Sequence, residues 1–210
     1  MAFITREGHI ISTAEPEGWI EKSRTLSGKD DEQAFALLRK ALGWYQTHAA
    51  GAGEEGVAAC LFGEAMALLH IATLHADRKE WKESSRFFAD ARSFFARVAA
   101  MEAEGNLLTD YGSATNETIA LRNLSISCGR MKEYRRALEA ADASRDLCRE
   151  LGDIAGESQS LQFGAYALAS LNRHAEAIQR LETAVRLARE AGDEPFAARL
   201  LSDIAGMRRR

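Results

Sequence analysis

The sequence is poor in residues that interrupt or cross-link a chain. Its 210 residues include only two prolines, Pro16 and Pro195, and three cysteines. Because proline breaks the interior of a helix, a chain with so few of them can be helical over long stretches. Cys60, Cys128 and Cys148 are few, odd in number and widely spaced. They fit reduced, buried thiols better than a disulfide framework or a zinc site, so we expect a cytoplasmic protein.

Long apolar runs and an excess of basic charge are also lacking. No run of about 18 apolar residues stands out, so we expect no membrane span. Arg6, Glu7 and His9 stand where a signal peptide needs an apolar core, which argues against secretion by that route. The net charge is −4 and basic residues are scattered among acidic ones, except in the run 208–210. A nucleic-acid partner is therefore not predicted.

Motifs of catalysis and of metal binding are missing as well. The sequence has no Ser/His/Asp order, no glycine loop that could hold phosphate and no HExxH. His70 and His75 are five residues apart, which turns them about 140° from one another on a helix, so they cannot share a metal ion locally. We therefore expect no metal, no cofactor and no enzymatic activity.

The sequence is rich in good helix formers. Ala, Leu, Glu and Arg dominate, and 46% of the residues are hydrophobic, enough for one packed domain or one repeat array. Strand-like alternation is nearly absent after residue 12, so we predict an all-α protein. The stretch 105–116 is expected to be a loop, with Thr115 or Asn116 capping the next helix. Helices are expected over 16–27, 31–49, 54–77, 80–104, 115–130, 133–151, 155–171, 174–191 and 194–208.

An internal repeat is visible in LCRELGD (147–153) and LAREAGD (187–193), which lie forty residues apart. Small side chains recur at three positions of this unit, one in the first helix of each pair and two in the second. Two helices can approach closely only where such side chains lie between them, so we expect buried seams there. The twelve positions are Ala72, Ser125, Ala165 and Ala205, then Ala34, Ser84, Ala137 and Ala177, then Ala41, Ala91, Ser144 and Ala184.

The ends of the repeat carry helix start and stop signals. Gly152 and Gly192 can adopt the left-handed conformation that ends a helix. Asp153 and Asp193 follow directly and can cap the next helix, and Pro195 falls in a first turn, where its missing N–H costs little. The repeated phrase therefore marks the end of one helical hairpin and the start of the next.

These positions resemble the tetratricopeptide repeat (TPR) family, in its longer variety of forty-odd residues per repeat. The resemblance covers about residues 30–207 and implies a right-handed α–α superhelix of about four TPR-like hairpins with a C-terminal capping helix. We expect an N-terminal arm over 1–29, with room for a short helix, and a repeat domain over 30–210. HEAT or armadillo repeats share the length but not this pattern of small residues. The resemblance rests on Leu121, Leu124, Ser125, Tyr134, Ala137, Ala141 and Ser144 in one unit and on Leu161, Gly164, Ala165, His174, Ala177, Leu181 and Ala184 in the next.

The resemblance also implies a binding groove lined by the first helix of each hairpin. The expected function is a protein–protein interaction or scaffold module that binds a peptide or protein segment there. Arg122, Arg130 and Arg199 could present guanidinium groups to an acidic peptide. Arg122 occupies a slot of the family's carboxylate clamp, but Ile126 fills its partner slot, which argues against chaperone-tail binding. The expected groove residues are Met66, Leu69, Thr73, Asp77, Arg122, Ile126, Arg130, Gln159, Gln162, Tyr166, Ser170 and Arg199.

Two other functions stay open from the sequence. The phrase RFFADARSFFARV places Phe87 and Phe94 on one stripe and Phe88 and Phe95 on another. One stripe belongs to the hairpin core, and the second packs on a neighbouring unit or forms a homodimer, which would suit a self-assembling structural protein. A ligand-sensing regulatory module is the other alternative, because pockets in a groove can hold small molecules.

Overall fold

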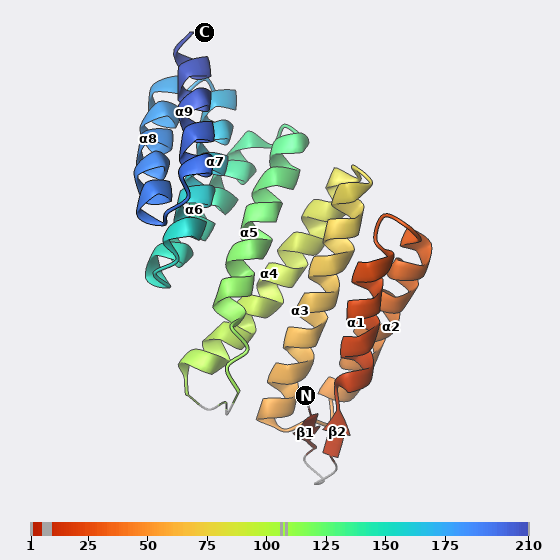
Figure 1. Ribbon diagram of the computed structural model, residues 1–210. Coiled ribbons are helices and arrows are strands. Elements are labelled where there is room, and N and C mark those ends of the chain that lie inside the picture. The colour runs from red at the N-terminus through yellow and green to blue at the C-terminus, as the bar shows by residue number, and fades with distance from the viewer. Residues whose placement is uncertain (1, 6–9, 106, 108, 210) are drawn as a thin grey trace. The chain divides into compact units, whose positions relative to one another are not determined.

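The computed structural model describes residues 2–5, 10–105, 107 and 109–209. The chain divides into two compact units, one ending at Glu117 and the other running from Thr118 to Arg210. Each unit is built from antiparallel helices that lie side by side in chain order (Figure 1). We refer to them as unit 1 and unit 2.

Unit 1 contains two helical hairpins and a small strand pair. Strands β1 (Ala2–Ile4) and β2 (Ile10–Ser12) pair antiparallel, with the backbone of Phe3 opposite Ile11. The helices are α1 (Ala14–Leu26), α2 (Asp31–Ala49), α3 (Glu54–Asp77) and α4 (Trp81–Ala103), followed by the first turn of α5.

Unit 2 contains two further hairpins and a last single helix. Its helices are α5 (Ser113–Arg130, from Thr118 onward), α6 (Tyr134–Glu150), α7 (Ile154–Ser170), α8 (His174–Glu190) and α9 (Glu194–Arg208). Helix α9 packs on α8 and is the expected capping helix of the α7–α8 hairpin.

The all-α prediction and the TPR-like pairing of helices are confirmed. Every expected helix is present, with ends within one or two residues of the expected ones. The helix expected over 16–27 pairs with α2 and is the first helix of a complete hairpin. The division at residue 30 stays a prediction.

Two local expectations differ from the structure. The pair β1–β2 was not expected, because three-residue strands are too short for alternation to reveal them. Helix α5 begins at Ser113, so Thr115 and Asn116 lie inside it and do not cap it. Gly112, with φ of 62°, makes the turn into the helix instead.

The small residues lie at the seams between helices, as predicted. Eleven of the twelve are buried, with exposed fractions of 3% or less. The exception is Ala205 on α9, which is exposed together with Leu201 because no other described helix covers that side of α9. The small residues are therefore buried wherever a partner helix packs against them.

The serines at the seams also join helices by hydrogen bonds to the backbone. Ser125 Oγ on α5 donates to the Ala137 carbonyl of α6 at 2.8 Å, and Ser144 Oγ donates back to the Thr118 carbonyl at 3.2 Å. Ser158 Oγ on α7 bonds to the Ala184 carbonyl of α8 at 2.8 Å. A serine fits the space of an alanine and satisfies its hydroxyl on a helix carbonyl, which explains why both residues occur at these positions.

The predicted turn signals between hairpins are confirmed. Gly152 and Gly192 have φ of 70° and 77°, and Asp153 and Asp193 accept hydrogen bonds from the third residue after each. The turns inside hairpins place Lys79, Lys132 and Asn172 in the same left-handed region, with φ of 61°, 64° and 61°. Such a conformation costs a residue with a side chain about 1–2 kcal/mol.

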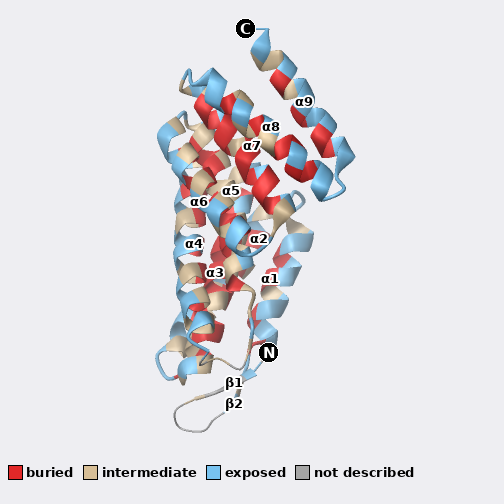
Figure 2. Ribbon diagram, turned by 90° about the vertical axis from the view of Figure 1, so that its left-hand side faces the viewer, coloured by how far each residue is buried: buried red, intermediate tan, exposed pale blue. Residues whose placement is uncertain are grey.

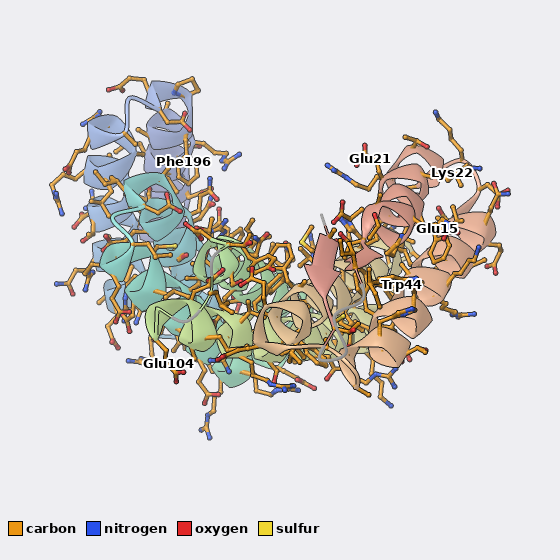
Figure 3. All side chains as sticks on the ribbon, turned by 90° about the horizontal axis from the view of Figure 1, so that it is seen from below. Glu15, Glu21, Lys22, Trp44, Glu104 and Phe196 are labelled. Carbon is orange, nitrogen blue, oxygen red and sulfur yellow. The ribbon has the colours of Figure 1, made fainter. Side chains whose placement is uncertain are left out.

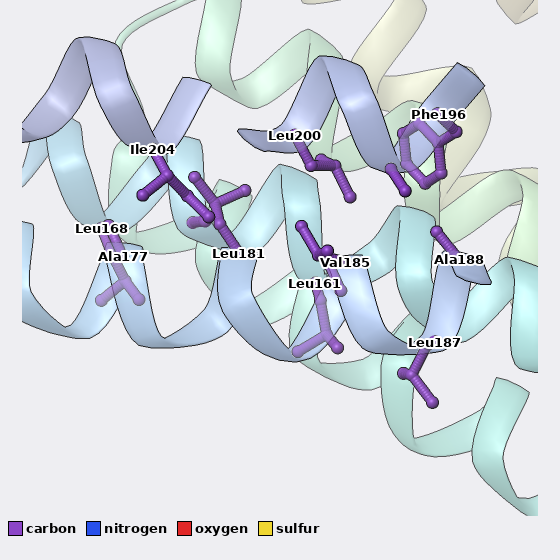
Figure 4. Close-up of a cluster of buried hydrophobic side chains, with 13 residues drawn as sticks. Leu161, Leu168, Ala177, Leu181, Val185, Leu187, Ala188, Phe196, Leu200 and Ile204 are labelled. Carbon is purple, nitrogen blue, oxygen red and sulfur yellow. The ribbon is translucent and has the colours of Figure 1, made fainter. Parts of the chain in front are cut away.

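Buried residues gather where the helices of each unit meet (Figure 2). In unit 2, Leu181 and Val185 of α8 pack against Leu200 and Ile204 of α9, with Leu161 of α7 on the other side (Figure 4). In unit 1, α3 is buried around most of its circumference between α2 and α4.

Helix α3 is the most apolar helix among the described residues. It is long and apolar enough to cross a membrane by length and composition, with mean hydropathy of 1.8 over an 18-residue window, and in this it differs from the expectation that no such run is present. Because 72% of that window is buried inside the protein, the pattern is that of a core helix.

The four phenylalanines of α4 pack within unit 1. Phe88 and Phe95 are 2% and 0% exposed and form the core stripe with Ala91. Phe87 is half-buried and stacks on His75 at 5.3 Å between ring centroids, while Phe94 packs beside Val98. A homodimer through this helix stays a prediction.

Replacing Ala137 by leucine should destabilise the protein by about 1–3 kcal/mol, because the added atoms would separate α5 from α6. Ala143 lies on the same helix but is exposed, so Ala143→Leu should change the free energy of unfolding by less than about 0.5 kcal/mol. Urea unfolding followed by circular dichroism measures both, and equal values for the two variants would contradict the seam.

Replacing Gly192 by alanine should cost about 1 kcal/mol, because its left-handed backbone disfavours any Cβ although the space around it is open. Lys132→Gly should not destabilise, since it relieves the same strain in a turn of α5–α6. Thermal midpoints of the two variants test this, and a lower midpoint for Lys132→Gly would count against it.

Candidate functional site

The face of unit 2 formed by α5, α7 and α9 is hollowed. Helices α5 and α7 are the first helices of their hairpins, and α9 is the single helix that follows the α7–α8 hairpin. Between α5 and α7 lies a hollow of about 440 Å³, with Ile126, Arg130, Phe163, Tyr166 and Ser170 among its lining residues. This volume is within the usual range of ligand pockets.

Two further hollows lie between α7 and α9. One, of about 430 Å³, is lined by Tyr166, Ser170 and Asp203 among others. The other, of about 450 Å³, is lined by Gln162, Phe163 and Arg199 among others. Because Tyr166, Ser170 and Phe163 each line the α5–α7 hollow as well, the three hollows form one continuous surface, which we call the unit 2 groove.

The structure brings together most of the expected groove residues of unit 2. The seven that line the groove are Ile126, Arg130, Gln159, Gln162, Tyr166, Ser170 and Arg199. Arg122 does not line it. Its Nη1 lies 3.3 Å from Thr118 Oγ1 and 3.6 Å from Cys148 Sγ, so the guanidinium is held between α5 and α6. That these residues bind a peptide stays a prediction.

A hydrogen-bonded row of side chains crosses the groove from α7 to α9. Gln162 Nε2 donates to the Tyr166 hydroxyl at 2.7 Å, and this hydroxyl donates to Asp203 Oδ2 at 2.5 Å. Burial, followed by the hydrogen bond to the Asp203 carboxylate, raises the pKa of Tyr166 to about 12. Nearby, the Arg199 guanidinium lies over the Phe196 ring, 4.8 Å from its centroid.

The four expected groove residues of unit 1 are placed differently from one another. Leu69 is buried, Thr73 donates its hydroxyl to the Leu69 carbonyl at 2.9 Å, and Asp77 is exposed at the end of α3. Met66 lines a pocket of about 210 Å³ between α1 and α3. We call it the unit 1 pocket.

Sequence reasoning missed several lining residues for identifiable reasons. Phe163 lies one residue beyond Gln162, and the 159, 163, 166, 170 spacing on one helix face would have found it. Asp203 contributes to the groove through its hydrogen bond with Tyr166 of another helix. No local sequence pattern around Asp203 indicates this contact. The α1 side of the unit 1 pocket was missed because α1 had not been assigned as the first helix of a hairpin.

Within the described residues, no group of three or more His, Cys, Asp or Glu side chains is placed to hold a metal ion. Cys60, Cys128 and Cys148 are free thiols, and all three are buried. Burial raises the pKa of the Cys60 thiol to about 12, so it is not a thiolate near neutral pH.

One protein family matches the chain over most of its length. The match is to the family described as anaphase-promoting complex subunit 5, over residues 24–98 and 127–209. The unmatched stretch between these segments contains the boundary between unit 1 and unit 2. No curated protein matches the chain.

Solved structures share the fold at low sequence identity. RapI in its apo form is 15% identical, with a TM-score of 0.70 over 92% of this chain. Aspartyl phosphate phosphatase F from Bacillus subtilis is also 15% identical, with a TM-score of 0.69 over 93% of this chain. The chain spans 62% of the former protein and 44% of the latter. A kinesin light chain-type protein from Podospora anserina with TPR-like repeats is 12% identical, with a TM-score of 0.56 over 94% of this chain and 96% of its own.

Replacing Tyr166 by phenylalanine should reduce the loss of stability at alkaline pH. A tyrosine whose pKa is raised on folding stabilises the folded state fully below about pH 10, and this stability is lost as pH rises from 10 toward 12, because only the unfolded chain ionises in that range. Urea unfolding at about pH 8 and pH 11 measures the loss. An equal loss in both proteins would mean that folding does not raise the pKa of Tyr166.

Proposed function

The chain belongs to the anaphase-promoting complex subunit 5 family, and from this membership and the shape of unit 2 we propose that it is a protein–protein interaction module. Its binding surface is the unit 2 groove, and its ligand is a peptide or protein segment in extended conformation. The observation that carries the proposal is the continuity of three hollows across α5, α7 and α9.

The lining of the groove favours a ligand of mixed character. Phe163 and Ala167 offer apolar contact between α5 and α7, which suits an apolar side chain of the ligand. Arg130 and Arg199 line hollows on either side of α7 and are both exposed, which suits a ligand carboxylate. Tyr166 lies between them as an amphipathic side chain, 38% exposed, of the kind that is enriched at protein interfaces.

The family name supports a place in a larger assembly, because it is that of a subunit of a multiprotein complex. Part of the proposal is that the chain acts by binding and not by catalysis, within the cytoplasm, and without nucleic acid or membrane as partner. Three buried, free thiols are consistent with a reducing compartment.

The proposal predicts that charge reversal in the groove weakens peptide binding and that the same change elsewhere does not. Peptides selected from a random displayed library on the wild-type protein would be titrated by fluorescence anisotropy against variants. Arg199→Glu should weaken binding about tenfold or more, and Tyr166→Ala likewise. Arg186→Glu is the matched control, since Arg186 is an exposed arginine of α8 outside the groove residues.

Arg186→Glu should bind within about twofold of wild type. Circular dichroism spectra and thermal midpoints establish that each variant is folded. If Arg199→Glu and Tyr166→Ala are folded and bind the selected peptides as tightly as wild type, the groove is not the binding surface.

A further inference from the structure

The unit 1 pocket has a chemical character of its own. It lies between facing stripes of α1 and α3, the first helices of the first two hairpins. On α1 the stripe consists of Glu17, Ile20, Glu21 and Arg24, which helical spacing brings to one side. At about 210 Å³ the pocket is smaller than most drug-sized sites, which limits its ligand to a small molecule.

Aromatic rings form much of its wall. Tyr45 of α2 lies directly on the backbone of α3, because a Cβ at Gly63 would come within 2.2 Å of its ring. Phe62 and Tyr111 pack together with 5.2 Å between their ring centroids, and the Tyr111 hydroxyl donates to Glu55 Oε1 at 3.2 Å. The faces of such rings are electron-rich and attract cations.

The charged groups at the pocket are acidic on balance. Glu21 and Arg24 form an ion pair at 3.1 Å, with side chains that are 69% and 60% exposed. Glu17 accepts a hydrogen bond from Thr13 Oγ1 at 2.6 Å and adds a further carboxylate. With His70 neutral, the lining side chains carry two negative charges and one positive.

One residue of the pocket lining carries a buried polar atom without a hydrogen-bond partner. Among the described residues, His70 Nε2 is buried and makes no hydrogen bond. Burial, followed by the nearby Arg24 charge, lowers the pKa of His70, so the ring is neutral near pH 7. A neutral imidazole nitrogen can accept a hydrogen bond, and leaving it without one destabilises the folded protein.

We propose that the unit 1 pocket binds a small organic cation, a primary ammonium group carried on an apolar or aromatic body. The ammonium group donates to His70 Nε2 and lies beside the Glu21 carboxylate. The apolar body lies against the rings of Tyr45, Phe62 and Tyr111. This site is separate from the unit 2 groove, and the proposal does not rest on peptide binding there.

The experiment compares two probes of similar shape and opposite charge on the full chain. Phenethylamine supplies the ammonium group and 3-phenylpropionate supplies a carboxylate, and isothermal titration calorimetry measures both near pH 7.5. We expect phenethylamine to bind with a Kd of about 0.1–1 mM, as its size allows, and 3-phenylpropionate to bind at least about tenfold more weakly.

Charge variants on α1 then test whether the pocket prefers a positively charged ligand. Glu21→Gln should weaken phenethylamine binding about two- to fivefold, and Arg24→Gln should strengthen it by a similar factor, because Arg24 competes for Glu21 and repels the ligand. Glu15→Gln and Lys22→Gln are matched controls, since these residues lie on other sides of α1 and do not line the pocket (Figure 3). Both controls should leave the Kd unchanged.

His70→Leu separates recognition from folding. It should abolish measurable binding while raising the thermal midpoint of the ligand-free protein by about 2–4 °C, because the buried nitrogen without a partner is removed. A merely structural histidine would not combine these two effects. The proposal is overturned if 3-phenylpropionate binds as tightly as phenethylamine, if neither probe binds at about 5 mM, or if Glu21→Gln and Arg24→Gln shift the Kd in the opposite directions.

Discussion

Close approach of paired helices at small side chains is the constraint on which the rest of the structure depends. Alanine and serine at three recurring positions let each hairpin close, and the serines Ser125, Ser144 and Ser158 add hydrogen bonds to carbonyls of the facing helix. Glycine does the same at Gly63, where the Tyr45 ring occupies the place of a side chain. A larger residue at any of these positions would separate the two helices and remove the dispersion contacts along the hairpin.

The hollows lie along α1 and α3 in unit 1 and along α5, α7 and α9 in unit 2. In unit 2 the hollows between α5, α7 and α9 are joined by shared residues and crossed by the row Gln162–Tyr166–Asp203. In unit 1 the hollow between α1 and α3 is smaller, ringed by aromatic side chains and acidic on balance. The same architecture therefore carries two hollowed surfaces of different chemistry.

The sequence predicts the repeats well because the seam residues and the turn residues recur with a fixed period. It predicts both helices of the first hairpin but assigns α1 to an N-terminal arm, since α1 is only 13 residues long and carries none of the recurring small positions. The TPR positions identify seven side chains of the unit 2 groove. Once the repeat has been aligned, the spacing of residues along a helix tells which of them lie on the same face. The TPR positions do not predict the placement of Arg122, because its guanidinium group is oriented by contacts with Thr118 and with Cys148 of another helix. Contacts between distant segments, such as Tyr166 with Asp203, leave no local pattern to read.

Two buried polar side chains of helix α3 differ in whether they have a hydrogen-bond partner. An apolar helix enclosed between α2 and α4 has little reason to carry polar side chains, yet it has both Glu64 and His70. Glu64 is 6% exposed and receives a hydrogen bond from Gln46 Nε2 at 3.4 Å, while burial raises the pKa of its carboxyl group. The buried carboxyl group of Glu64 therefore has a hydrogen-bond partner within unit 1. His70 Nε2 has no hydrogen-bond partner among the described residues, and His70 is one of the residues that line a pocket with aromatic walls. Departures of this kind from good packing are expected at functional positions, where a ligand supplies the missing partner.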